Sequence, residues 1–245
     1  MPRLPVPLPG AGARKVDARS ERWREHRKKV RADIVDAAFR AIDREGPQVS
    51  LREIAAEAGT AKPKIYRHFN DKADLFHAIG KRLREMLIAA IFGNLDFATD
   101  STREVVRRSV AEYVNLVDQH PNVLRFILQG RFPEPTESTT RGFNEGREIT
   151  MAMALLFNNE LRGMDVDPAA LELAAAATFG SASSATDWWL GNDPESPRRM
   201  PSGEFVTHLT TIMLGTIQGT ADLLGIDLDP DLPVRSATPR SAPVG

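Results

Sequence analysis

The chain of 245 residues contains no cysteine, which excludes disulfide bonds, thiolate nucleophiles and zinc sites built on cysteine. It also contains no apolar run close to the ~20 residues that a helix needs to cross a bilayer, so we expect no transmembrane segment. Residues 1–10 are rich in proline and lack the apolar core of a signal peptide. These absences predict a cytoplasmic protein.

The residue patterns of enzymes are missing as well. The five histidines show no pair at i, i+4 spacing that a carboxylate would complete as a metal site. The sequence contains neither a glycine-rich phosphate loop nor a nucleophile elbow. It therefore predicts a protein that is not an enzyme and that needs no metal and no cofactor.

Lysine is confined to the first third of the chain, where all seven lysines lie at or before Lys81. Residues 1–84 hold 20 of the 32 basic and 11 of the 33 acidic residues, a net charge of +9, so the remainder holds 12 basic and 22 acidic residues, a net charge of −10. A basic end of this kind indicates a polyanionic partner such as DNA. The alternative is a solvated charged surface without a partner.

The strongest local pattern is two short helices joined by a tight turn, within the basic part of the chain. Ser50 and Glu53 form an S-x-x-E capping box that starts the first helix, and Gly59 supplies the turn after it. In the second helix Ile65 and Phe69 point inward, so its lysine and arginine side chains point outward. This is the layout of a helix-turn-helix, whose second helix enters the major groove of DNA.

Apolar residues recur at helical spacing along most of the remaining chain, which predicts an all-α fold without strands. The first helix is expected to begin between Ser20 and Lys28 and to end at Gly46-Pro47, with Val30, Ile34, Ala38 and Ile42 as its buried stripe. A fourth helix is expected to be capped by Asp71 and to carry a buried stripe of Leu75, Ile79, Leu83, Leu87 and Ile91. Further helices are expected at 101–120, 122–130, 138–161, 168–190 and 202–224. We predict four segments: a disordered basic and proline-rich arm, a helix-turn-helix DNA-binding domain, a larger helical domain and a disordered tail, over residues 1–19, 20–76, 77–225 and 226–245.

The helix-turn-helix resembles the DNA-binding domain of the TetR family of bacterial transcriptional regulators over about residues 30–84. The matching elements are Ile54-Ala55, Ala58-Gly59, the run from Lys62 to Phe69, and Lys72. Ala61 departs from the family pattern, which often has a capping serine at this position. The resemblance implies about nine helices and a C-terminal domain that binds a ligand and forms a homodimer through a four-helix bundle.

The resemblance also implies which residues contact DNA. Positions that tend to face bases are occupied by Arg52, Lys62, Pro63 and Lys64. Positions that tend to hold the phosphate backbone are occupied by Tyr66, His68 and Lys72. The alternative for each is an exposed helical side chain without a partner. The basic residues from Arg14 to Arg31 either add contacts to phosphates and the minor groove or only keep the chain soluble.

Small residues on the last two helices are expected at the dimer interface, because they let helices approach closely: Gly180 to Ala185, Gly215 and Gly219. The ligand pocket is predicted from aromatic, methionine and arginine side chains: Arg125, Phe126, Phe143, Arg147, Met151, Phe157, Phe179 and Trp188. The apolar members suit a pocket wall and the arginines suit an anionic head group. For each apolar member, packing in the core is the alternative.

Together these patterns predict a repressor that binds a palindromic DNA operator as a homodimer and is released by a small apolar effector, without a membrane partner. Arginines beside an apolar pocket favour a long-chain fatty acid or its coenzyme A ester as the effector. One alternative is a regulator of drug efflux that senses a cationic or aromatic compound. Another is a ligand-independent DNA-binding protein, which would have a filled C-terminal core.

Overall fold

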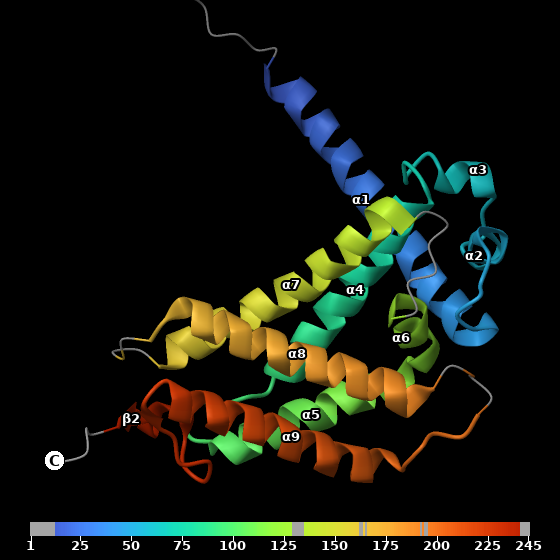
Figure 1. Cartoon of the computed structure of the whole chain (residues 1–245). Helices are drawn as coiled ribbons and strands as arrows, with labels where there is room; N and C mark the ends of the chain where they lie inside the picture. Colours follow the sequence, from blue (N-terminus) through green and yellow to red (C-terminus); the bar gives the residue numbers. More distant parts are fainter. Residues whose placement is uncertain are drawn as a thin grey trace, which may run out of the picture.

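Nine helices account for nearly all regular structure in the part of the chain that is described (Figure 1). The computed structural model describes residues 13–128, 135–161, 164, 166–191, 193 and 196–240; side chains are described from Ser20 onward, except within 129–147. The predicted all-α fold and the predicted number of helices are confirmed for these residues.

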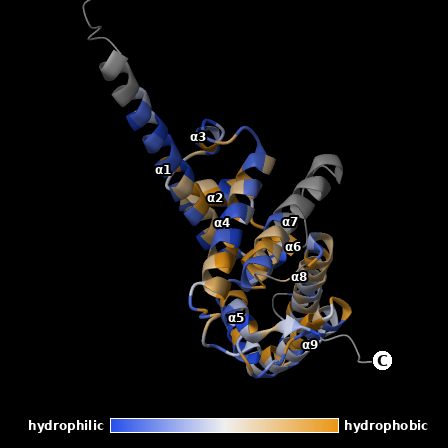
Figure 2. Cartoon of the chain, turned by 90° about the vertical axis from the view of Figure 1, so that its left-hand side faces the viewer, coloured by the Kyte–Doolittle hydropathy of each residue, from blue (hydrophilic) through white to orange (hydrophobic). Residues whose placement is uncertain are grey.

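The first helix, α1 (Ala13–Glu45), begins earlier than predicted. The expected start between Ser20 and Lys28 is wrong because no proline or glycine follows Gly12 until Gly46, and alanine, arginine, lysine and glutamate favour helix. Residues 20–29 of this helix are hydrophilic and project from the body of the molecule (Figure 2). Its C-terminal half carries the predicted buried stripe, so only this half contributes to the core.

Two short helices follow, α2 (Leu51–Glu57) and α3 (Lys62–Ile65). The predicted capping box is confirmed, because the Ser50 side chain accepts from the Glu53 amide while the Glu53 carboxylate accepts from the Ser50 amide. Gly59 has φ +59°, a conformation that favours glycine. Ala61 provides no side-chain cap for α3, as its departure from the family pattern predicts.

Helix α4 (Lys72–Phe92) connects the helix-turn-helix to the rest of the protein. Asp71 caps it by accepting from the Asp74 amide. The predicted buried stripe is confirmed at four positions one turn apart: Leu75, Ile79, Leu83 and Leu87. One rigid helix therefore belongs to both parts of the molecule.

Five helices form the larger C-terminal part: α5 (Thr102–Gln119), α6 (Pro121–Leu128), α7 (Pro135–Glu160), α8 (Pro168–Leu190) and α9 (Ser202–Leu223). Helix α8 packs between α7 and α9, and α9 also packs along α5 (Figure 1). Trp189 of α8 is fully buried and stacks on Phe205 of α9 with ring centroids 4.4 Å apart. This contact joins the two helices at one end and leaves their outward faces open.

The segment after α9 was predicted to be disordered, but residues 226–240 are ordered in the structure. It forms two short antiparallel strands, β1 (Ile226–Asp227) and β2 (Thr238–Pro239), and a 3₁₀ turn, η1 (Val234–Ser236). Its proline and serine content does not prevent order, because Ile226, Val234 and Ala237 are buried and Thr102 donates its amide to the Leu232 carbonyl at 2.9 Å. The prediction that the chain has no strands is wrong here.

Candidate DNA-binding surface and effector cavity

The predicted DNA-contact residues lie on α2, on α3 with the turn that follows it, and at the start of α4. Six of them are exposed to solvent: Arg52, Lys62, Pro63, Lys64, Tyr66 and Lys72. Ile65 and Phe69 are each 1% exposed and anchor the recognition helix in the core. The helix therefore presents its basic side chains outward from a fixed position, as binding in a major groove requires.

His68 is less accessible than the other six residues. Its Nδ1 atom is buried and has no hydrogen-bond partner among the described residues. Burial lowers the pKa of His68, and the nearby positive charges of Arg27, Lys64 and Arg31 lower it further. The lowered pKa favours the neutral form of the ring, which has one N–H group to donate.

Arg31 holds the recognition helix against α1 and α4. Its guanidinium donates to the His68 main-chain carbonyl and forms an ion pair with Asp74, with Nη2 and Oδ1 2.8 Å apart. It also lies over the Phe69 ring, 4.1 Å from the centroid. The hydrogen bond from Arg31 lowers the pKa of the Asp74 carboxyl group. Sequence analysis placed Arg31 at the end of a basic run, but its half-buried side chain packs against Phe69 and Asp74.

A cavity of about 570 Å³ lies between α4, α5, α6, α7, α8 and α9. Its wall is overwhelmingly apolar and includes Leu87, Ile88, Val110, Met153 and Met213. The volume is in the range of pockets for small organic ligands. This cavity is the candidate effector site.

Two of the eight predicted pocket residues line this cavity, Phe157 and Phe179. Phe143 and Arg147 lie outside the residues whose side chains are described. Met151 and Trp188 do not line it, because their side chains are 44% and 46% exposed on the outer surface. Helical spacing does not distinguish the two faces of a helix that is apolar on both, so sequence analysis could not separate these positions.

Arg125 and Phe126 also lie away from the cavity. The Arg125 guanidinium is buried and donates to the carbonyls of Leu190 at 2.8 Å and Gly191 at 3.3 Å, so it caps the C-terminal end of α8. Burial lowers the pKa of Arg125. Phe126 packs on Phe76 of α4, with ring centroids 4.8 Å apart. Both residues hold helices together, and the structure does not place them in the predicted ligand role.

Sequence analysis missed the contribution of α4 to the cavity. This helix supplies His77, Arg84, Ile88 and Ile91 to the wall. A signal was present, because Ile88 is apolar although it lies outside the stripe of Leu75, Ile79, Leu83, Leu87 and Ile91. Such an extra apolar position indicates a second apolar face.

The polar groups in the wall have partners within the protein. Arg84 pairs with Glu148 of α7, with Nη1 and Oε2 2.9 Å apart. The hydroxyl groups of Tyr113 and Thr186 are 2.7 Å apart. Burial raises the pKa of Tyr113 to about 12, so this hydroxyl stays neutral. Among the described residues, the wall therefore has one guanidinium, that of Arg84, and the imidazole of His77 in an otherwise uncharged surface.

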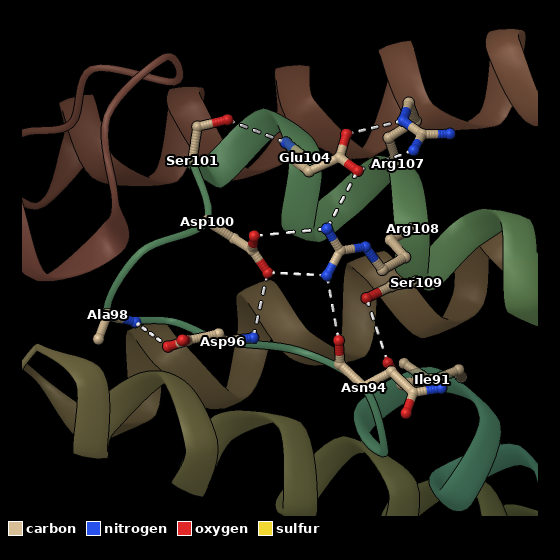
Figure 3. Close-up of polar contacts among 10 residues, drawn as sticks. All are labelled: Ile91, Asn94, Asp96, Ala98, Asp100, Ser101, Glu104, Arg107, Arg108 and Ser109. Atoms are coloured by element: carbon tan, nitrogen blue, oxygen red, sulfur yellow. Dashed lines mark hydrogen bonds and ion pairs between the residues drawn. The ribbon is translucent and has the colours of Figure 1, made fainter.

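The loop between α4 and α5 closes the cavity beyond the end of α4, where Leu95 and Phe97 line it. Arg108 holds this loop by donating to the Asn94 carbonyl at 3.1 Å and to the Asp100 carboxylate at 2.8 Å (Figure 3). The far wall of the cavity is thus fixed by hydrogen bonds to α5.

The same arginine belongs to a wider network at the start of α5. Glu104 accepts hydrogen bonds from Arg107 and Arg108, and its amide binds the Ser101 hydroxyl group (Figure 3). The bond from Arg107 is the main cause that lowers the pKa of Glu104 to about 2, with a further contribution from Arg108. The lowered pKa means that the Glu104 carboxylate stays charged at a lower pH than an ordinary glutamate does.

The outward faces of α8 and α9 carry exposed apolar side chains together with glycines. Leu173, Ile212 and Leu223 are 69%, 51% and 84% exposed. A Cβ atom added at Gly180, Gly215 or Gly219 would meet no atom within 4 Å, so contacts within this chain do not require glycine there. Exposed apolar and small residues on two adjacent helices suit the close approach of another helix pair. Ala182 of the same run instead lines the cavity.

Neither a membrane span nor a metal site emerges from the described residues. None of the helices there is both long and apolar enough to cross a membrane. Likewise, within the described part of the chain, no three histidine, aspartate or glutamate side chains are grouped as metal ligands.

Two family models match the chain. The model of bacterial regulatory proteins of the tetR family matches residues 34–79, and the model of the tetracyclin repressor-like C-terminal domain matches residues 90–227. Together they cover the helix-turn-helix and the helices that surround the cavity.

Individual proteins are similar over most of the chain. An uncharacterized HTH-type transcriptional regulator from Mycobacterium tuberculosis is 30% identical over 216 residues, which cover 86% of this chain and 87% of the relative. A tetR-family transcriptional regulator from Streptomyces coelicolor shares the fold with a TM-score of 0.61 at 21% identity, over 80% of this chain and 83% of that chain.

The transcriptional regulator FadR from Bacillus subtilis, solved in complex with stearoyl-CoA, has a TM-score of 0.55 at 18% identity, over 77% of this chain and 98% of that chain. A likeness at this identity shows the fold alone. The family matches and the mycobacterial relative go further, and the prediction that the chain is not an enzyme agrees with them. The chain belongs to the TetR family of bacterial transcriptional regulators and is a DNA-binding regulator.

Proposed function

We propose that this regulator is a homodimeric repressor that leaves a palindromic operator when a long-chain acid, free or as its coenzyme A ester, fills the cavity. The observation that carries the proposal is the apolar cavity of about 570 Å³ along α4, the helix that also begins at the DNA-binding surface. A ligand-independent DNA-binding protein would have a filled core, so the cavity argues against that alternative.

On the DNA side, the proposed base-reading residues are Arg52, Lys62, Pro63 and Lys64, and the proposed phosphate-binding residues are Tyr66, His68 and Lys72. The exposure of all but His68 supports these roles. Two recognition helices of a dimer must lie about 34–36 Å apart to enter successive major grooves. The proposed dimer therefore sets the operator geometry.

The charge of the cavity wall favours an acid over a cationic drug. The described lining residues include Arg84 and His77 but no aspartate or glutamate, so a cation would find no counter-charge there. The stearoyl-CoA bound by FadR from Bacillus subtilis is an acyl ligand on the same fold, which supports this choice. A regulator of drug efflux is the second candidate, and an aromatic compound without charge would suit the apolar wall.

The proposed dimer forms through α8 and α9. Their exposed face combines large apolar side chains with glycines, as in Leu223 and Gly215. This arrangement would make a four-helix bundle in which each subunit contributes two helices. Since the recognition helices belong to different subunits, any change of the α4 direction alters the distance between them.

Release from DNA follows from the position of α4. The helix contacts the cavity with His77 and Arg84 and holds the recognition helix through Asp74 and Arg31. A ligand that favours a different α4 position shifts the population away from the DNA-binding state, by no more than its differential affinity for the two states. The link between cavity and recognition helix is therefore a single helix with contacts at both ends.

A titration of operator-bound protein with fatty acids of increasing length tests the proposal, with a cationic drug-like compound as comparison. We expect release by the acids, with an affinity that rises by up to ~0.8 kcal/mol for each CH₂ group that becomes buried. Release by the cationic compound and by none of the acids would instead support the efflux regulator.

A further inference from the structure

Arg84 is largely buried, but the glutamate that forms its ion pair is mostly exposed. Its side chain is 14% exposed and borders the apolar cavity, whereas the carboxylate of its partner Glu148 belongs to a side chain that is 61% exposed. A guanidinium that is largely removed from water requires a counter-charge, because leaving it unpaired is costly. A mostly solvated glutamate loses little when it returns to water, since exposed ion pairs contribute little.

We propose that Arg84 is the head-group site of the cavity and that the carboxylate of a free long-chain acid binds it by displacing Glu148. The exchange replaces one carboxylate with another, so the charge balance of the site is unchanged. The displaced glutamate becomes hydrated, and the ligand carboxylate forms its ion pair in the less exposed position. This inference rests on the proposed function, because it assumes that the cavity accepts a long-chain acid.

The positions of the wall residues define how the acid lies. Arg84 precedes Phe92 by two turns of α4, a rise of about 12 Å along the helix axis. Beyond that helix end, Leu95 and Phe97 form an apolar wall that the Arg108 hydrogen bonds hold in place. On the other side of Arg84 the α4 wall continues to Ala73 and includes the imidazole of His77. We therefore place the head of the acid at Arg84 and its tail along α4 toward the loop that precedes α5, where Leu95 and Phe97 are apolar.

The exchange also has a regulatory consequence, because the Arg84–Glu148 pair joins α4 to α7. An uncharged ligand of the same length can fill the apolar part of the cavity without breaking this pair. The head group of the acid breaks it. Acid binding thus changes a contact of the helix that carries the recognition helix.

The test compares dodecanoic acid with dodecan-1-ol in the full chain, through displacement of the neutral dye Nile red. The variants are Arg84→Gln, Arg84→Lys and Glu148→Gln. Arg84→Gln is expected to weaken acid binding about tenfold to a hundredfold, as for the loss of a hydrogen bond between charged groups, and to leave alcohol binding unchanged. Arg84→Lys is expected to recover part of the acid affinity. Glu148→Gln is expected to strengthen acid binding about two- to fivefold, because it removes the internal competitor.

Three other outcomes would overturn the assignment. If Arg84→Gln lowers acid and alcohol binding equally, or changes neither of them, Arg84 is not the head-group site. The proposed lipid sensing still holds in that case if the acid displaces the dye from the unchanged protein. If neither compound displaces the dye from the unchanged protein, the proposed function fails as well. If Arg84→Gln does not fold, Glu148→Gln decides, and an unchanged acid affinity in that variant contradicts the displacement of Glu148.

Discussion

The DNA-binding region and the effector region of this regulator are stabilised in different ways. The first, from the end of α1 to the start of α4, combines short-range caps with a polar clamp in which Arg31 reaches both the recognition helix and α4. The second packs long apolar helices around a cavity of about 570 Å³. The region proposed to place a rigid helix in a groove is filled and clamped, and the region proposed to admit a ligand keeps space at the cost of packing.

Removing one aromatic ring from each region gives the largest expected contrast. Phe69→Ala removes a side chain that is 1% exposed and is expected to cost about 3–5 kcal/mol of unfolding free energy and to abolish operator binding. The Phe179 side chain borders the cavity, so Phe179→Ala is expected to lower the unfolding free energy clearly less. Urea unfolding followed by far-UV circular dichroism measures both. Equal losses would contradict the difference between a filled and a hollow region.

The clamp is expected to show the next largest effect. Arg31→Met removes hydrogen bonds to the charged partner Asp74. It is expected to lower the unfolding free energy by about 1.5–3 kcal/mol and to lower operator affinity. Operator binding measured by fluorescence anisotropy and urea unfolding give the two quantities. A variant that keeps full operator affinity would show that the clamp does not position the recognition helix.

The clamp also predicts a pH dependence. The folded-state pKa of Asp74 lies below the unfolded value of about 3.9. The stability that this carboxylate contributes is therefore fully present above that unfolded value and is lost as the pH falls through the lowered folded pKa. The difference in unfolding free energy between the unchanged protein and Asp74→Asn is expected to shrink from about pH 4 downward. A difference that is constant over this range would show that the pair makes no charged contribution.

Gly215→Leu sharpens the comparison on the outer face of the effector region. If α8 and α9 form the dimer, the leucine overpacks the interface and costs about 1–3 kcal/mol of association. Within one subunit the same position is open, so Gly215→Ala is expected to stabilise the helix by roughly 0.5–1 kcal/mol while it weakens the dimer. Sedimentation equilibrium and unfolding curves separate the two effects. Undiminished association of the leucine variant would place the interface elsewhere.

The smallest expected effects are those of single exposed lysines on the DNA surface. Lys64→Ala is expected to cost about 1 kcal/mol of operator binding and to relax base preference at one position. Lys72→Ala is expected to weaken binding to all DNA sequences alike. It is also expected to lower the slope of log affinity against log salt concentration by about 0.9. Binding to operator variants over a series of salt concentrations distinguishes them. An unchanged base preference for Lys64→Ala would remove it from the proposed base readers.

The parts of the structure that could be predicted depend on neighbours in sequence. The Ser50–Glu53 capping box, the turn at Gly59 and the stripe of Leu75 and Ile79 all involve residues within a few positions of each other. The start of α1 and the ordered segment after α9 were predicted wrongly. In the second case the proline and serine content was less informative than the burial of Ile226, which clusters with Leu161, Met164 and Val166 from the connection between α7 and α8.

The cavity was predicted least well. Phe157 and Phe179 line it, whereas Arg125 caps α8 and Trp188 faces outward. Arg84 was not predicted to line the cavity, because in the sequence alone it cannot be distinguished from the exposed arginines of other helices. Its position in the wall depends on α7 and α8, which lie more than fifty residues away in the chain.

The sequence by itself determined the helix-turn-helix, the basic character of the DNA-binding end and the all-α fold, because caps, turns and helical periodicity are set by contacts within about one turn of the chain. Only the tertiary structure decided which apolar residues fill the core, which line the cavity and which remain exposed on α8 and α9. The physical reason is that the hydrophobic effect favours burial without direction. An apolar side chain is equally suited to a core, a pocket or an interface until the neighbouring helices are in place.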